Sequence, residues 1–153
     1  VLFADTAQQK EDIWRMRRTM AEAVKSNSIY KEEDTVVPRA ALPQLINGIK
    51  EIGAKYGFES VCYGHAGDGN LHINIIKAGM SDEDWKHKLK DGIVEIFELT
   101  AALGGTSSGE HGIGLVQKDY MPIKYSEIHL NLMRNIKTVF DPNAILNPGK
   151  ITP

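Results

Sequence analysis

The stretch that constrains this chain most runs from Tyr63 to Ile75 and reads YGHAGDGNLHINI. Asp68-Gly69 within it is a strong signal for a tight turn, because glycine adopts positive φ without steric cost and aspartate tolerates it better than most residues. A two-residue turn here predicts a β-hairpin in which His65 lies directly opposite His72. Opposed side chains point to the same face, with Cβ atoms roughly 5 Å apart, so both imidazoles can reach one metal ion.

Alternation along the two predicted strands, about 58–64 and 71–77, divides their side chains between two faces. Tyr63 and Asn74 share one face with the two histidines. The other face carries small or apolar residues that suit a protein core: Cys62, Gly64, Ala66, Leu71, Ile73 and Ile75. By spacing alone, the histidine pair fits either a functional site or a hydrogen-bonded structural pair.

Helical periodicity and helix-end signals predict helices before and after this hairpin. Their bounds are about 8–25 after a capping box at Thr6, Leu42 to Gly57, Ser81 to Gly104, and about 126–140. Residues 35–37 add a short strand, and 105–109 add an extended piece. The resulting order, βαββαβ, predicts an α+β domain of ferredoxin-like type, an antiparallel sheet with helices on one face, plus flanking N- and C-terminal helices.

The chain has 153 residues, enough for one domain but not for two full ones. Hydrophobic residues make up 42% and charged residues 25%, which argues against disorder, and the formal charge of −2 argues against nucleic acid as the main partner. Cys62 is the only cysteine, so nothing points to an oxidising compartment. No apolar run is long enough to cross a membrane. Because the chain begins with Val1 inside ordinary-looking sequence, we expect a piece of a longer protein.

A second informative stretch, residues 104–114, reads GGTSSGEHGIG. Five glycines in eleven residues exclude an ordinary helix and predict a sharp turn or a close approach to another group. The stretch lacks the glycine spacings of known phosphate-binding loops. Its adjacent Glu110 and His111 offer an oxygen ligand and a base, or else they cap and brace the loop.

Together the two stretches offer two histidines and a carboxylate, His65, His72 and Glu110, for one metal ion with positions left open for water or substrate. His111 diverges from its neighbour and is better placed as a base beside the metal. The same ligands suit a metal-dependent hydrolase, although no second carboxylate base stands at a recognisable spacing. A non-catalytic ferredoxin-like binding module would need none of them.

Three segments, HAGDGNLHINI, GGTSSGEHGIG and FDPNAILNPGK, closely resemble the C-terminal domain of FAD-linked oxidases of the D-2-hydroxyacid dehydrogenase type. This group includes the glycolate oxidase large subunit, cytochrome-linked D-lactate dehydrogenase and D-2-hydroxyglutarate dehydrogenase. The resemblance implies oxidation of a small 2-hydroxyacid by hydride transfer to FAD. Family proteins carry an FAD-binding domain before this one, so residues 1–153 are expected to be the substrate- and metal-binding domain without it, inactive and free of FAD on their own.

The resemblance also implies roles for individual residues. It matches the ligands of a divalent metal, zinc or manganese, to His65, His72 and Glu110. His111 matches the proposed base, and Arg17 matches an arginine that binds the substrate carboxylate, a task that suits its bidentate fork. The other matched residues are the substrate contact Asn74 and a terminal turn that lies against the flavin, Asn147, Pro148 and Lys150.

The resemblance says less about the substrate, the partners and the cellular location than about the site residues. Ala21 stands where D-2-hydroxyglutarate dehydrogenases carry a threonine, and their substrate-binding lysine falls near Lys31 in a loose alignment, which favours glycolate or D-lactate. Expected partners are the FAD-binding domain of the same full-length chain and an unknown electron acceptor or redox partner, and a homodimer stays open. The expected location is cytoplasmic, at a membrane if a redox partner lies there, or mitochondrial in a eukaryote.

Overall fold

The computed structural model describes residues 3–26 and 28–153, and the side chain of Ala21 also lies outside what is described. In chain order the regular elements are α1 (Ala7–Lys25), β1 (Tyr30–Val36), η1 (Arg39–Ala41), α2 (Leu42–Tyr56), β2 (Glu59–Tyr63), β3 (Asn70–Ile76), α3 (Asp82–Ala102), η2 (Lys118–Tyr120), α4 (Met121–Lys124) and α5 (Glu127–Phe140). The predicted helices and both hairpin strands are confirmed, and α4 is an additional short helix.

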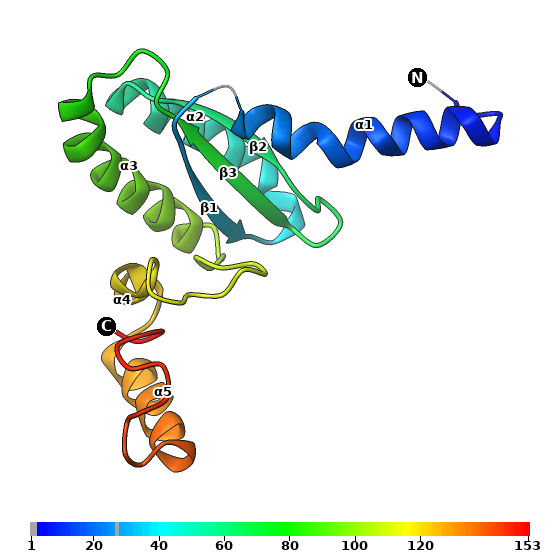
Figure 1. Cartoon of the computed structure of the whole chain (residues 1–153). Helices are drawn as coiled ribbons and strands as arrows, with labels where there is room; N and C mark the ends of the chain where they lie inside the picture. The colour runs from blue at the N-terminus through cyan, green and yellow to red at the C-terminus, as the bar shows by residue number, and fades with distance from the viewer. Residues whose placement is uncertain (1–2, 27) are drawn as a thin grey trace.

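The three strands form one antiparallel sheet in the order β1-β3-β2, so β3 is the central strand. Helices α2 and α3 pack against each other and cover one face of this sheet (Figure 1). Leu71, Ile73 and Ile75 alternate along β3 and are at most 5% exposed on the covered face. Leu45 and Ile49 of α2 are fully buried against the same core. The α+β class and the predicted core side of the hairpin are therefore confirmed.

The helix ends follow from local chemistry. Thr6 accepts a hydrogen bond from the Gln9 amide, and the Gln9 side chain accepts one from the Thr6 amide, which is a complete capping box. Ser81 accepts a hydrogen bond from the Asp84 amide at 3.0 Å and begins α3. Gly57 ends α2 in the left-handed region, with φ of 87°. These ends lie where the sequence predicts them.

Strand β1 is longer than the predicted 35–37, because it begins at Tyr30. Its first half is strongly polar and carries no strand signal of its own, yet it pairs residue by residue with the central strand. Glu33 lies opposite Ile73 on the core side, whereas Asp34 lies opposite His72 on the other face. Pairing with β3 therefore brings an acidic side chain to each face of the sheet.

The fourth strand predicted at 105–109 is reduced to a single bridge. Thr106 and Val36 exchange two backbone hydrogen bonds, of 2.9 and 3.2 Å. Beyond this bridge, the backbone amides of residues 109–111 donate to the Asp34 carboxylate instead of to a strand. Among the described residues, the ferredoxin-like order is thus present up to α3, and its last strand is confirmed only as this bridge.

The predicted flanking helices are both present. Figure 1 shows α1 projecting from one end of the sheet, and α5 with the terminal turn beside it below α3 and α4. Large hydrophobic side chains on both helices are exposed: Trp14, Met16, Met20, Ile128, Leu132, Val139 and Phe140. Within the described ranges, no helix is both long and apolar enough to cross a membrane.

Candidate functional site

The hairpin turn is longer than predicted. His65 and Asn70 exchange backbone hydrogen bonds of 3.1 and 3.3 Å, so residues 66–69 form a four-residue loop between them. Tyr63, and not His65, is the residue directly opposite His72. The predicted pairing of the two histidines is therefore wrong by two residues.

The environment of Gly69 explains why the turn is longer than predicted. Its φ is 78°, and a Cβ atom built on it would lie 2.0 Å from the carbonyl oxygen of Val37. The Val37 amide donates a hydrogen bond of 3.0 Å to the Gly69 carbonyl. The glycine is needed where the hairpin loop meets the segment after β1, and not at the tip of a two-residue turn.

A shift of two residues leaves every side chain on its predicted face, because side chains alternate along a strand with a period of two. His65 and His72 still share a face, and their ring centroids lie 6.4 Å apart. Tyr63 packs against His72 with ring centroids 5.6 Å apart. The histidines therefore meet by a diagonal contact across the hairpin.

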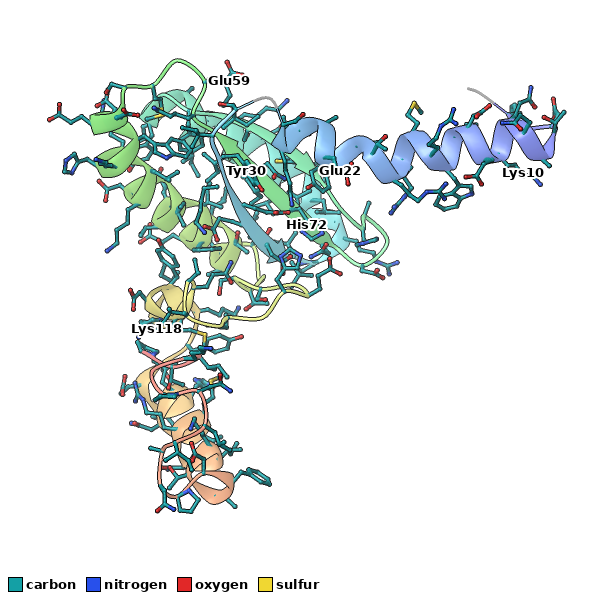
Figure 2. All side chains as sticks on the ribbon, viewed as in Figure 1. Lys10, Glu22, Tyr30, Glu59, His72 and Lys118 are labelled. Carbon is teal, nitrogen blue, oxygen red and sulfur yellow. The ribbon has the colours of Figure 1, made fainter. Side chains whose placement is uncertain are left out.

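Glu110 and His111 reach the histidines from the loop that follows α3. Figure 2 shows His72 at the end of the sheet that faces this loop. The Nε2 atom of His72 lies 3.0 Å from Oε1 of Glu110. The ring of His111 stacks on the ring of His72, with a centroid distance of 4.9 Å and an interplanar angle of 24°. The two glycine-containing stretches thus form one cluster, as predicted.

Two overlapping groups in this cluster have a metal-binding arrangement. The ligand atoms of His65, His72 and Glu110 lie within 4.8 Å of one another, and so do those of Asp34, His72 and His111. Two imidazoles and one carboxylate are a ligand set that binds zinc and related divalent ions while leaving positions open. Geometry alone does not choose between the two groups.

The hydrogen bonds of Asp34 decide between them. Its Oδ2 atom accepts the backbone amides of Gly109, Glu110 and His111 at 2.9, 2.7 and 2.9 Å. Its Oδ1 atom accepts the side-chain amide of Asn70 at 2.7 Å. Burial alone would raise the pKa of Asp34, but the hydrogen bonds from these amides outweigh it and lower the pKa below its usual value. Both oxygens of this ionised group are thus engaged within the protein, which leaves His65, His72 and Glu110 as the group that could hold an ion.

Unpartnered polar atoms lie on the same face of the sheet. Asn74 is fully buried, and neither its amide nitrogen nor its amide oxygen has a hydrogen-bond partner among the described residues. The buried Nδ1 atom of His72 also lacks a hydrogen bond within the described structure, although Asp34 Oδ1 lies 3.8 Å away. Buried polar groups are almost always paired in native proteins. Within the described structure, the Asn74 amide therefore lacks the partner that a buried amide usually has.

Arg17 brings positive charge to the open side of the cluster. It lines a pocket of about 280 Å³ together with Tyr63, His65 and His72. Arg18 lines the same pocket, but it forms an ion pair with Glu11 of α1. Arg15 also pairs with an acidic residue of this helix, Asp12. Within the described residues, Arg17 forms no such ion pair, and its guanidinium lies 5.7 Å from the centre of the Trp14 ring. It is thus available to an anion in the pocket.

Similarity to a known family covers nearly the whole chain. A family model described as FAD linked oxidases, C-terminal domain, matches residues 1–151. This chain belongs to that family. It is 37% identical over 152 residues to a D-lactate dehydrogenase from Anaerostipes hadrus, covering 99% of this chain and 32% of that protein. It is 35% identical over 150 residues to the glycolate oxidase subunit GlcD of Bacillus subtilis, covering 95% and 32%.

A third relative is a D-2-hydroxyglutarate dehydrogenase from Stutzerimonas stutzeri, which is 36% identical over 153 residues, covering 98% of this chain and 33% of that protein. The chain thus spans about a third of the length of these curated relatives. Among solved structures, a 4-ethylphenol oxidase from Gulosibacter chungangensis matches with a TM-score of 0.60 and 15% identity, covering 97% of this chain and 31% of that one. At that identity the likeness shows the fold alone.

The terminal turn of this FAD-linked oxidase domain lies apart from the histidine cluster, beside α5 (Figure 1). Lys150 donates from its ammonium group to the side chain of Asn147 at 3.1 Å. The next amide, of Ile151, donates to the carbonyl of Gly114 at 2.7 Å, and the Lys118 ammonium donates to the Gly149 carbonyl at 3.0 Å. The turn that carries the predicted cofactor residues Asn147, Pro148 and Lys150 is therefore joined through its Ile151 amide to the end of the glycine-rich loop.

Three other ionisable groups of the domain lie outside the site. Lys31 forms an ion pair of 3.2 Å with the buried Glu33 on the core side, so its side chain does not reach the histidine face. Gln117 donates to the same Glu33 carboxylate at 2.9 Å. Burial raises the pKa of the Cys62 thiol to about 11, so this thiol stays neutral and is a poor metal ligand.

Asp34 is the site residue that sequence reasoning missed. The available signal was an acidic residue directly before a β-branched run that ends at Pro38. A solvated charge before a short strand has the same appearance, and only the pairing of β1 with β3 turns Asp34 toward His72.

Proposed function

We propose that the chain is the substrate- and metal-binding domain of an FAD-dependent enzyme that oxidises a small D-2-hydroxyacid, of the glycolate or D-lactate type, to the 2-oxoacid. Membership of the FAD-linked oxidase family supports the reaction class. Relatives named for D-lactate, glycolate and D-2-hydroxyglutarate support the substrate class. The observation that carries the proposal is the cluster of His65, His72 and Glu110 on the sheet face that also holds the unpartnered amide of Asn74.

In this proposal His65, His72 and Glu110 would hold one divalent ion, zinc or manganese. Such an ion, when bound, supplies Lewis-acid polarisation of the substrate oxygens. Arg17 binds the substrate carboxylate through the two parallel N–H groups of its guanidinium. Asn74 offers its amide to a substrate oxygen and thereby gains the hydrogen bonds that it otherwise lacks.

His111 accepts the proton of the 2-hydroxyl group at its Nε2 atom, while FAD, when bound, supplies the acceptor for the hydride. The FAD is held mainly by a further domain of the full-length enzyme. Asn147, Pro148 and Lys150 contribute the contact of this domain with the flavin. The domain itself supplies orientation and charge, and the redox chemistry belongs to the cofactor.

Steady-state kinetics of the full-length enzyme with a panel of D-2-hydroxyacids and an artificial electron acceptor test the proposal. We expect glycolate or D-lactate to be oxidised with a higher kcat/KM than D-2-hydroxyglutarate. A metal-dependent hydrolase would instead leave all hydroxyacids unchanged and cleave ester or amide substrates. That outcome would overturn the proposed reaction.

The metal ligands lead to a separate prediction. Replacing both His65 and His72 with alanine should weaken Zn²⁺ binding by about a hundredfold or more, which corresponds to about 3 kcal/mol, because two of three protein ligands are lost. Isothermal titration calorimetry with Zn²⁺ measures the change. A double variant of the two histidines outside the cluster, His87→Ala with His129→Ala, removes the same number of imidazoles and should bind Zn²⁺ normally. Equal affinity in both double variants would contradict the assigned ligands.

A further inference from the structure

Asp34 lies at the back of the site and connects its parts. It is 1% exposed, on β1, directly opposite His72 of β3. Three successive backbone amides, from Gly109 to His111, converge on its Oδ2 atom. Successive amides that point at one acceptor form an anion-binding concavity. Here the anion is a side chain of the protein itself, and the amides belong to the loop that carries Glu110 and His111.

Gly109 allows the loop to approach Asp34 closely. A Cβ atom at Gly109 would lie 2.1 Å from the side-chain nitrogen of Asn70 and 3.0 Å from Oδ1 of Asp34. Asn70 in turn donates to Asp34 at 2.7 Å and to the carbonyl of Thr35 at 3.3 Å. One carboxylate therefore joins β1, β3 and the glycine-rich loop within a space that has no room for another side chain.

Asp34 is also the acidic group beside the inner nitrogen of His72. The Nδ1 atom of His72 lies 3.8 Å from Asp34 Oδ1, while Nε2 lies 3.0 Å from Glu110. A neutral imidazole carries its proton on one nitrogen and a lone pair on the other. With a metal ion held at Nε2, the ring proton would lie on Nδ1, on the side of the imidazole that faces Asp34.

We propose that Asp34 is the positioning residue of this site: it fixes Glu110 and His111 through their backbone amides and places its carboxylate beside Nδ1 of His72. The inference rests on the proposed function, because that function gives Glu110, His111 and His72 their roles. It assigns Asp34 no contact with substrate or metal. It also accounts for the burial of a charged side chain whose Oδ2 atom has no basic partner among the described residues.

The first test is hydrogen exchange of the full-length protein without added metal, followed by NMR or mass spectrometry. In Asp34→Asn, exchange at the amides of 109–111 should accelerate by roughly ten- to a hundredfold, while the core amides of β3 stay protected. Glu32→Gln is the matched control, because Glu32 lies on the same strand and face but pairs with Lys25. Unchanged exchange at 109–111, or equal acceleration throughout the fold, would overturn the positioning role.

The second test is a titration with Co²⁺ alone, whose visible absorption reports the number and geometry of its ligands. Asp34→Asn should weaken Co²⁺ binding by about 10- to 100-fold, with an altered spectrum, and Glu32→Gln should not. An unaltered protein that binds no Co²⁺ would contradict the metal site of the proposed function, whereas the exchange test decides the role of Asp34 independently.

The Gly109→Ala variant separates the position of the loop from the charge of Asp34. It also provides a test if Asp34→Asn fails to fold. This variant keeps the Asp34 carboxylate but displaces the loop from it. We expect the same accelerated exchange at 110 and 111 and the same loss of Co²⁺ affinity, with a far-UV circular dichroism spectrum like that of the unaltered protein. Normal exchange and normal Co²⁺ binding in Gly109→Ala would show that the loop needs no close approach to Asp34, and would overturn the proposal.

Discussion

Replacing His111 with alanine is expected to lower kcat of the full-length enzyme by roughly 10² to 10⁴, with KM little changed. The ring of His111 stacks on His72 at 4.9 Å, and its Nε2 atom lies 3.9 Å from Oε1 of Glu110. The side chain is half exposed, so it can receive a proton beside the proposed metal ligands and release it to solvent. Because a base acts only as the proton moves, its loss affects the transition state more than the bound ground state.

The pH–rate profile gives this prediction a second readout. The acidic limb of the profile reports protonation of the essential base, so His111→Ala should remove that limb. His87→Ala is the matched control, because His87 lies exposed on α3 outside the cluster, and its profile should be unchanged. If His111→Ala raises KM as much as it lowers kcat and keeps the acidic limb, the substrate hydroxyl must lose its proton to another group.

Arg17→Ala should act on binding instead, raising KM and lowering kcat/KM by about a hundredfold, or about 3 kcal/mol. Arg17 lines the pocket beside His65 and His72 and forms no ion pair among the described residues. A carboxylate in this pocket would receive two parallel, charge-assisted hydrogen bonds from the guanidinium. The same contact persists from bound substrate to transition state, so its loss is felt mainly in KM.

Two further variants sharpen the Arg17 prediction. Arg15→Ala removes an arginine of the same helix that pairs with Asp12 at 3.0 Å and does not line the pocket, so its kinetics should be normal. Arg17→Lys keeps the charge without the planar fork and should fall between Arg17→Ala and the unaltered enzyme. A fall in kcat alone in Arg17→Ala would place this arginine in the chemical step and refute the binding role.

Local signals in the sequence determined the elements of this domain. The spacing of apolar residues and the terminal Gly57 identify α2, and the capping residues Thr6 and Ser81 mark where α1 and α3 begin. Alternation identifies the core side of β3. Each of these signals acts over one or two turns of helix or a few residues of strand, and such interactions need no partner from elsewhere in the chain.

The same local rules also brought together most of the candidate site. A period of two places His65 and His72 on one face in either register, so the cluster survives the error in the predicted turn. The adjacency of Glu110 and His111 in a glycine-rich loop marks them as candidates without any knowledge of the sheet. The sequence therefore identified these side chains and the face of the sheet on which the histidines lie.

Only the tertiary structure decided the register, the length of β1 and the role of Asp34. The register depends on Gly69 meeting the backbone of Val37, which is 32 residues away in sequence. The polar half of β1 becomes a strand because β3 supplies its hydrogen bonds. Asp34 draws the amides of 109–111 away from a fourth strand, since a buried carboxylate needs those donors more than the edge of the sheet does. Such long-range competition for hydrogen bonds leaves no periodic pattern in the sequence. The local preferences of each segment do leave such a pattern.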